Sequence, residues 1–121
     1  MERRVRISWL LDFYGDLLTA KQKKILDLHY NDDLSLGEIA EHEKISRQGV
    51  YDTLKRGESL LIDMENRLRL LQRHLATSQL LQRCLSYIED IKVHGNSRGH
   101  LDKMEKEIVD FIKDWEDEYG L

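Results

Sequence analysis

The sequence predicts an all-α protein, and three observations lead to that prediction. No proline occurs in the 121 residues, and 35% of them are charged while 40% are hydrophobic. Leu, Glu, Lys, Arg and Asp dominate and β-branched runs are absent, a composition that favours helices. Apolar residues also recur at helical spacing in successive segments. A chain of this length forms one compact unit, or one small domain with an extension.

The first helix is expected over residues 3–17, with Gly15 weakening its pattern near the end. Its apolar face consists of residues spaced three and four apart: Ile7, Leu10, Leu11, Tyr14 and Leu17/Leu18. Thr19 and Gln22 then match the capping box that starts a second helix, expected from residue 20 to about 31. Lysines near its start are interpreted as surface residues, with phosphate contact as the alternative.

Residues 35–61 contain the pattern around which the chain is organised, a short helix, a tight turn and a longer helix. Ser35 and Glu38 form a second capping box, and Ser46 is the candidate cap of the longer helix. The two helices are too short to bury their apolar faces alone, so they must pack on each other and on upstream residues. The apolar positions are Leu36, Ile39 and Ala40 on the first helix, and Val50, Leu54 and Leu61 on the second.

This arrangement is that of a helix-turn-helix unit, in which the second helix lies in a nucleic-acid groove. Its polar side holds the candidate contact residues, whose donors suit base edges and phosphates. They are the cap Ser46 together with Arg47, Gln48, Tyr51, Asp52, Lys55 and Arg56. A solvated face of an ordinary helix is the alternative, but the capped upstream helix and the turn favour nucleic-acid contact.

Beyond the turn, the pattern continues without an obvious stop signal. A heptad-spaced seam of Leu61, Met64, Leu68, Leu71 and Leu75 predicts that the second helix runs unbroken to about residue 74. Ser78 is expected to cap a further helix to about His94, and residues 94–100 form a loop with two glycines. The last helix carries apolar residues at heptad spacing: Leu101, Met104, Ile108, Phe111/Ile112 and Trp115.

We therefore expect a nucleic-acid-binding domain at residues 1–60 and a helical extension at residues 61–121. Periodicity does not decide whether the seams close within the chain or across a dimer. Two shorter helices would leave part of the apolar surface of the long helix uncovered. A twofold dimer also suits two DNA half-sites. These considerations favour a homodimer.

The formal net charge of −4 argues against a protein that binds nucleic acid non-specifically over its whole surface. Residues 44–60 hold four basic and two acidic side chains, whereas residues 101–121 hold eight acidic side chains and three lysines. A mildly basic face thus precedes an acidic tail, for which solubility is the default role.

The single cysteine, Cys84, predicts a buried thiol in a reducing compartment. No segment suits a membrane span or a cleaved leader, so a soluble cytoplasmic protein is expected.

Catalytic and metal chemistry are not expected. The five histidines are scattered, and none is spaced with cysteines or carboxylates as metal ligands are. The sequence has no glycine-rich phosphate loop after a strand, and no nucleophile with a plausible base and orienting group. We expect no cofactor and no metal.

The residues from Leu18 to Leu60 resemble the helix-turn-helix of region 4 of bacterial sigma factors. The closer resemblance is to the YlxM family of small bacterial proteins, over residues 7–75. Its pattern is met by Leu11-Asp12-Phe13-Tyr14, Leu17-Leu18-Thr19, Gln22-Lys23, Asp32-Asp33, Ser35-Leu36-Gly37-Glu38-Ile39-Ala40, Ser46-Arg47-Gln48, Val50-Tyr51-Asp52 and Lys55-Arg56.

This resemblance implies a sigma-region-4-like DNA-binding fold in the winged-helix-like superfamily, and a role in transcription regulation. The family's genes commonly neighbour those of the signal recognition particle, which implies a link to protein secretion. The sequence departs from the usual helix-turn-helix pattern at Lys44, where glycine is usual, and at Glu43 and Thr53, where apolar residues are usual. Leu54 is therefore expected to supply the buried anchor.

Three hypotheses follow from the sequence. The first is a dimeric regulator that binds duplex DNA in the major groove, with Arg47, Gln48 and Tyr51 at bases and Lys55 and Arg56 at phosphates. The second is an adaptor that binds the RNA or a protein of the signal recognition particle. The third is a purely structural dimer.

Overall fold

A computed structural model describes residues 1–119 and confirms the all-α prediction, since every regular element among these residues is a helix. The elements are α1 (Arg3–Tyr14), the 3₁₀ turn η1 (Gly15–Leu17), α2 (Ala20–Tyr30), α3 (Leu36–Glu43), α4 (Arg47–Leu68), α5 (Leu70–His94) and α6 (His100–Tyr119). The chain forms two compact units, Met1–Arg73 and a second that begins at His74. The first unit extends beyond the boundary at residue 60 that the sequence suggested.

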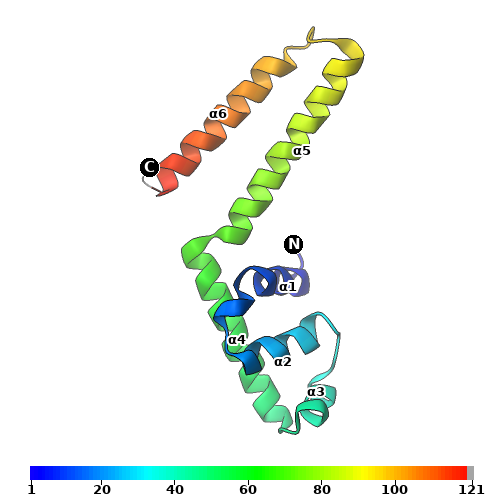
Figure 1. The fold of residues 1–121 in the computed structure, drawn as a ribbon, viewed down its shortest axis with the longest axis vertical. Helices are drawn as coiled ribbons and strands as arrows, with labels where there is room; N and C mark the ends of the chain where they lie inside the picture. The colour runs from blue at the N-terminus through cyan, green and yellow to red at the C-terminus, as the bar shows by residue number, and fades with distance from the viewer. Residues whose placement is uncertain (120–121) are drawn as a thin grey trace. The chain divides into compact units, whose positions relative to one another are not determined.

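In the first unit, α1, α2 and α3 pack along one side of α4 (Figure 1). The core is built from the apolar faces that helical spacing indicated, with an aromatic ring from α1 among its largest members. Its fully buried side chains are Ile7, Leu10, Tyr14, Ile25, Leu26, Ile39, Val50, Leu61 and Leu71. Since no single short helix is stable alone, this shared core is what holds the helices in place.

A glycine on α4 permits the closest helix crossing in this core. Gly57 is buried, and a Cβ atom added there would lie 2.5 Å from Leu26 Cδ1 on α2. Any other residue would overlap a side chain that is itself fully buried. Gly57 thus allows α2 and α4 to pack at short range.

Three of the four predicted helix caps, Thr19, Ser35 and Ser46, are confirmed. Thr19 and Ser35 each form a complete capping box, with the backbone N–H of Gln22 and Glu38 donating to the respective hydroxyl at 3.1 Å. Ser46 accepts a hydrogen bond from the backbone N–H of Gly49 at 3.0 Å. These caps satisfy N–H groups that a helix start otherwise leaves without partners.

The prediction of one unbroken helix from Arg47 to about residue 74 is wrong. α4 ends at Leu68, Arg69 takes a left-handed conformation with φ of 56°, and α5 starts at Leu70. The break interrupts the predicted seam. Leu61 and Leu71 lie in the core, Met64 and Leu75 are half-buried, and Leu68 is 47% exposed.

Two buried side chains from outside α5 account for the break. Glu65 is only 4% exposed, and its carboxylate accepts hydrogen bonds from the backbone N–H groups of Leu71 (3.0 Å) and Gln72 (2.9 Å). The hydroxyl of Tyr14 donates to Glu65 Oε1 at 2.7 Å and accepts from the N–H of Leu70 at 3.0 Å. Together these groups cap the new helix, so the interruption leaves no N–H group of the turn without a partner.

A second buried carboxylate ties α4 to α1 and α2. Glu58 accepts a hydrogen bond from Arg3 Nη2 at 2.9 Å and one from the hydroxyl of Tyr30. Burial, and then the hydrogen bond to Glu58, raise the pKa of Tyr30 to about 12. The neutral phenol is therefore the form that the folded unit favours.

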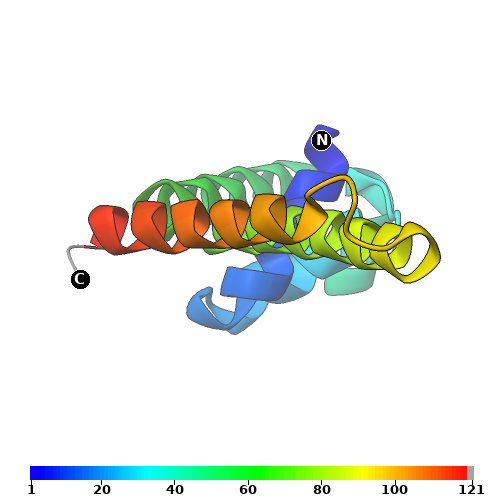
Figure 2. The same ribbon diagram turned by 90° about the horizontal axis from the view of Figure 1, so that it is seen from above.

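The second unit is an antiparallel pair, α5 and α6, joined by the predicted glycine loop (Figures 1 and 2). Gly95 and Gly99 have φ near +70°, a conformation that suits residues without a Cβ atom. The prediction that Ser78 caps a helix is wrong, because α5 already starts at Leu70 and Ser78 lies inside it. The pairing is held near the loop, where His100 Nε2 contacts Asp90 Oδ2 at 2.6 Å.

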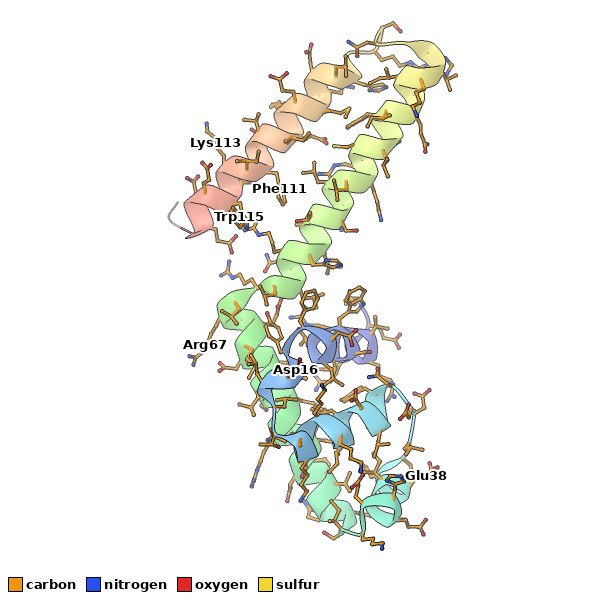
Figure 3. The ribbon with its side chains drawn as sticks, in the orientation of Figure 1. Asp16, Glu38, Arg67, Phe111, Lys113 and Trp115 are labelled. Atoms are coloured by element: carbon orange, nitrogen blue, oxygen red, sulfur yellow. The ribbon has the colours of Figure 1, made fainter. Side chains whose placement is uncertain are left out.

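Much of the apolar surface of this second unit stays open to solvent. Cys84 is a buried free thiol, as predicted, but large apolar side chains on both helices are between about a third and two thirds exposed. They are Leu81, Leu85 and Ile88 on α5, and Leu101, Ile108, Val109, Ile112 and Trp115 on α6. Figure 3 shows Phe111 and Trp115 on the side of α6 turned toward α5, and Lys113 on the opposite side.

Candidate nucleic-acid interface

The helix-turn-helix consists of α3, a three-residue turn and α4. Lys44 ends α3 in the left-handed conformation, with φ of 57°, at the position where glycine is usual. The backbone N–H of Ile45 then donates to the carbonyl of Ala40 at 3.1 Å, which closes the turn. Leu54 is buried and Thr53 is half-buried, so the expectation that Leu54 is the anchor is confirmed.

Within the first unit, the predicted contact face of α4 is exposed. The seven candidates Ser46, Arg47, Gln48, Tyr51, Asp52, Lys55 and Arg56 are all exposed, while Val50, Leu54 and Gly57 on the other side of α4 are buried. This division follows the helical period, which places positions three and four apart on one face. The first unit thus presents this face to a ligand, and Tyr51 on it is 45% exposed.

Side-chain contacts order part of this face. Gln48 Nε2 donates a hydrogen bond to Asp52 Oδ1 at 3.0 Å, one helical turn later. The ammonium group of Lys55 lies 5.5 Å from the centre of the Tyr51 ring, which is within the range of a cation–π contact. Both contacts connect residues of the face to each other rather than to the core, so a ligand can replace them.

The charges of the face are only partly neutralised. Lys55 Nζ lies 3.7 Å from Glu58 Oε2, a weak ion pair with a buried carboxylate that Arg3 also contacts. Within residues 1–119, Arg47 and Arg56 have neither a hydrogen bond nor an ion pair. Three cations therefore stand against the single carboxylate of Asp52 on the face, and two of them are available to a polyanion.

One feature of the interface escaped the sequence analysis, the contact between Arg47 and Gly37 on α3. A Cβ atom added to Gly37 would lie 2.9 Å from Arg47 Nη2, and 3.2 Å from both Cζ and Nε. The guanidinium group forms one wall of an open hollow between the two helices. The hollow is lined by Ser35, Gly37, Glu38, Ala40, Glu41, Ile45 and Arg47. A glycine in the first turn of a helix is the one signal in the sequence that points to a close neighbour.

Two of the three lysines at the start of α2, Lys23 and Lys24, form ion pairs with side chains of the first unit. Lys23 Nζ pairs with Asp16 at 2.6 Å, and Lys24 Nζ pairs with Glu43 at 3.2 Å. Each hydrogen bond lowers the pKa of its carboxyl partner. Glu38, labelled in Figure 3, likewise has a lowered pKa because the backbone and hydroxyl of Ser35 bond to it.

Among residues 1–119 no group of three or more His, Cys, Asp or Glu side chains is arranged to hold a metal ion. No helix there has both the length and the apolar character needed to cross a membrane.

Comparison with known proteins identifies the family. A family model described as "UPF0122: Putative helix-turn-helix protein, YlxM / p13 like" matches residues 1–98. A UPF0122 protein of Clostridium kluyveri is 44% identical over 112 residues, covering 93% of this chain and 100% of the relative. A UPF0122 protein of Acetivibrio thermocellus is 52% identical over 92 residues, 76% of each chain. One from Bacillus pumilus is 39% identical over 106 residues, covering 88% of this chain and 96% of the relative.

Proposed function

Since the chain belongs to the UPF0122 family of YlxM/p13-like helix-turn-helix proteins, we propose that it is a DNA-binding regulator that reads duplex DNA with α4. The observation that carries this proposal is the open face of α4. It presents the amide of Gln48, the phenol of Tyr51 and the guanidinium groups of Arg47 and Arg56, directly after a capped α3 and a tight turn. Among residues 1–119 these two guanidinium groups have neither a hydrogen bond nor an ion pair. In helix-turn-helix proteins the start of the second helix contacts base edges in the major groove.

The candidate contact residues of α4 fall into two groups, one that contacts base edges and one that contacts phosphates. Arg47, Gln48 and Tyr51 lie in the first turns of α4 and contact base edges, since Arg and Gln form bidentate pairs with guanine and adenine. Lys55 and Arg56 lie further along and contact phosphates, which adds affinity without sequence information. Asp52 orients Gln48 through their hydrogen bond.

Base readout and phosphate contact are separable by mutation. We expect Arg47→Ala to cost about 1–3 kcal/mol on the preferred site and to relax sequence preference. Lys55→Ala should weaken all duplexes alike and flatten the dependence of affinity on salt. Lys113→Ala is the matched control, because it removes the same charge from the outer side of α6. Affinities are measured on the selected duplex and on random duplexes. Equal losses for Arg47→Ala and Lys55→Ala on every sequence would refute the assigned roles.

An RNA target is the second candidate, and one observation favours it. Tyr51 is exposed, and an aromatic ring beside a cation can stack on an unpaired base as RNA-binding proteins do. If RNA is the target, the protein is an adaptor that binds the RNA or a protein of the signal recognition particle. If duplex DNA is the target, the protein regulates the secretion pathway of the signal recognition particle at the level of transcription. Either role is cytoplasmic and needs no catalysis. Binding assays with random duplex DNA and with the particle's RNA at equal salt distinguish the two.

The second unit supports a homodimer as part of the same proposal. α5 and α6 leave two stripes of large apolar side chains exposed, among them Leu85, Ile108 and Ile112. Contiguous exposed apolar surface is unusual for a monomer, and a second copy offers the same stripes by twofold symmetry. Sedimentation of the full chain tests this. We expect a dimer that Ile108→Asp together with Ile112→Asp dissociates, and a monomeric wild type at all concentrations would contradict it.

A further inference from the structure

We propose that Gly37 is a positioning residue for DNA recognition: its missing side chain lets the guanidinium group of Arg47 rest on α3 in a fixed place. The inference rests on the proposed DNA binding and extends it to a residue outside the contact face. Gly37 is the second residue of α3, and it lies in ordinary helical geometry without a positive φ. Backbone conformation therefore does not require a glycine here.

Helix stability does not require one either. Glycine in a helix is less favourable than alanine because it loses more conformational freedom on folding. The three atoms nearest to a Cβ at position 37 all belong to Arg47, so its closest neighbour is not a side chain of the core. Gly57 is different, because the atom nearest to its missing Cβ is on fully buried Leu26. The contact that glycine permits at position 37 is thus one with an exposed side chain of the candidate interface.

The geometry of that contact is specific to the guanidinium group. Three of its atoms, Nη2, Cζ and Nε, lie within 3.2 Å of the place where a Cβ would be. The guanidinium group, from Nε to Nη2, therefore lies over the place that a side chain at position 37 would occupy. No hydrogen bond or ion pair within residues 1–119 holds it there, so its donors stay available while packing restricts its position.

Restricting Arg47 before binding matters because arginine has many rotamers. Ordering one rotamer-rich side chain at an interface costs about 0.5–1.5 kcal/mol, so an arginine that is already placed binds more tightly. A methyl group at position 37 would displace the guanidinium group and restore that cost. By the conversion of 1.4 kcal/mol to a factor of ten, the expected loss of DNA affinity is roughly 2- to 10-fold.

The test is a double-mutant cycle with Gly37→Ala and Arg47→Ala in the full chain. The probe is a duplex that the wild type selects from a randomised DNA pool. We expect Gly37→Ala to fold with an unchanged or higher melting temperature, and yet to bind this duplex 2- to 10-fold more weakly. In the Arg47→Ala background, Gly37→Ala should change affinity by less than about 1.5-fold, because the group that it displaces is gone.

The outcomes separate this inference from the proposal on which it rests. A wild type that binds no duplex from the pool would overturn DNA binding itself. A wild type that binds, with a Gly37→Ala variant that binds equally well, would overturn the positioning role alone. Equal losses from Gly37→Ala in both backgrounds would also overturn it, because the effect would not pass through Arg47. Gly37→Ser serves as a second variant if the alanine variant fails to fold, with the same expected pattern.

Discussion

Replacing Glu65 by alanine tests how the break between α4 and α5 is held together. Glu65 is buried and accepts hydrogen bonds from the hydroxyl of Tyr14 and from the backbone N–H groups of Leu71 and Gln72. In Glu65→Ala, the buried N–H of Leu71 and the hydroxyl of Tyr14 lose this acceptor, at about 1–3 kcal/mol each. The N–H of Gln72 is only partly buried and can bond to water, so it adds little.

The expected loss is therefore about 2–6 kcal/mol, a large part of the roughly 5–15 kcal/mol that stabilises a typical domain. Urea unfolding followed by circular dichroism measures it as a lower midpoint with an unchanged slope. Glu41→Ala, on the exposed side of α3, is the matched control and should stay within about 0.5 kcal/mol of wild type. Glu65→Gln keeps one oxygen acceptor and should fall between the two. A loss below about 1 kcal/mol for Glu65→Ala would refute the account of the break.

The other predictions concern packing, capping and ionisation in the first unit. Gly57→Ala should destabilise it by about 1–3 kcal/mol in the same assay, since the added Cβ would lie 2.5 Å from fully buried Leu26; a more stable variant would contradict the close crossing. Ser35→Ala should cost about 1 kcal/mol of unfolding free energy because α3 loses its cap, and no loss would contradict this role. The folded-state pKa of Tyr30 is raised from 10.0 to about 12, so its stabilising effect is present below pH 10 and lost as pH rises through 12. The difference in unfolding free energy between wild type and Tyr30→Phe should therefore shrink over that range. A constant difference would contradict the raised pKa of Tyr30.

Helix starts and buried faces could be predicted because their signals are local. Thr19, Ser35 and Ser46 each accept a hydrogen bond from an N–H three residues later, so the sequence pattern and the contact coincide. The same holds for the exposed face of α4, which follows from the helical period alone.

The break at Arg69 could not be predicted because its cause is not local. No glycine or asparagine marks the left-handed position, and the hydroxyl that accepts from Leu70 comes from Tyr14, far away in the sequence. A heptad pattern continues across the break, so periodicity favoured one helix over two. Tertiary hydrogen bonds to a buried carboxylate decided the outcome, and this also explains why Ser78 lies inside α5 rather than at its start.

The contact between Gly37 and Arg47 has a similar explanation. The two residues belong to different helices, and their proximity depends on how α3 and α4 cross. Sequence spacing placed Arg47 on the contact face of α4, but it gave no direction for the side chain. The candidate face could thus be proposed from the sequence, whereas the role that we propose for Gly37 depends on how α3 and α4 cross in space.

The most direct test of the central claim is the affinity of the full chain for a selected duplex compared with random duplexes of equal length at physiological salt. If the open face of α4 reads sequence, the selected duplex should bind at least about 10³-fold more tightly, as specific DNA-binding proteins do. Equal affinity for every duplex, or no binding to any, would contradict the claim.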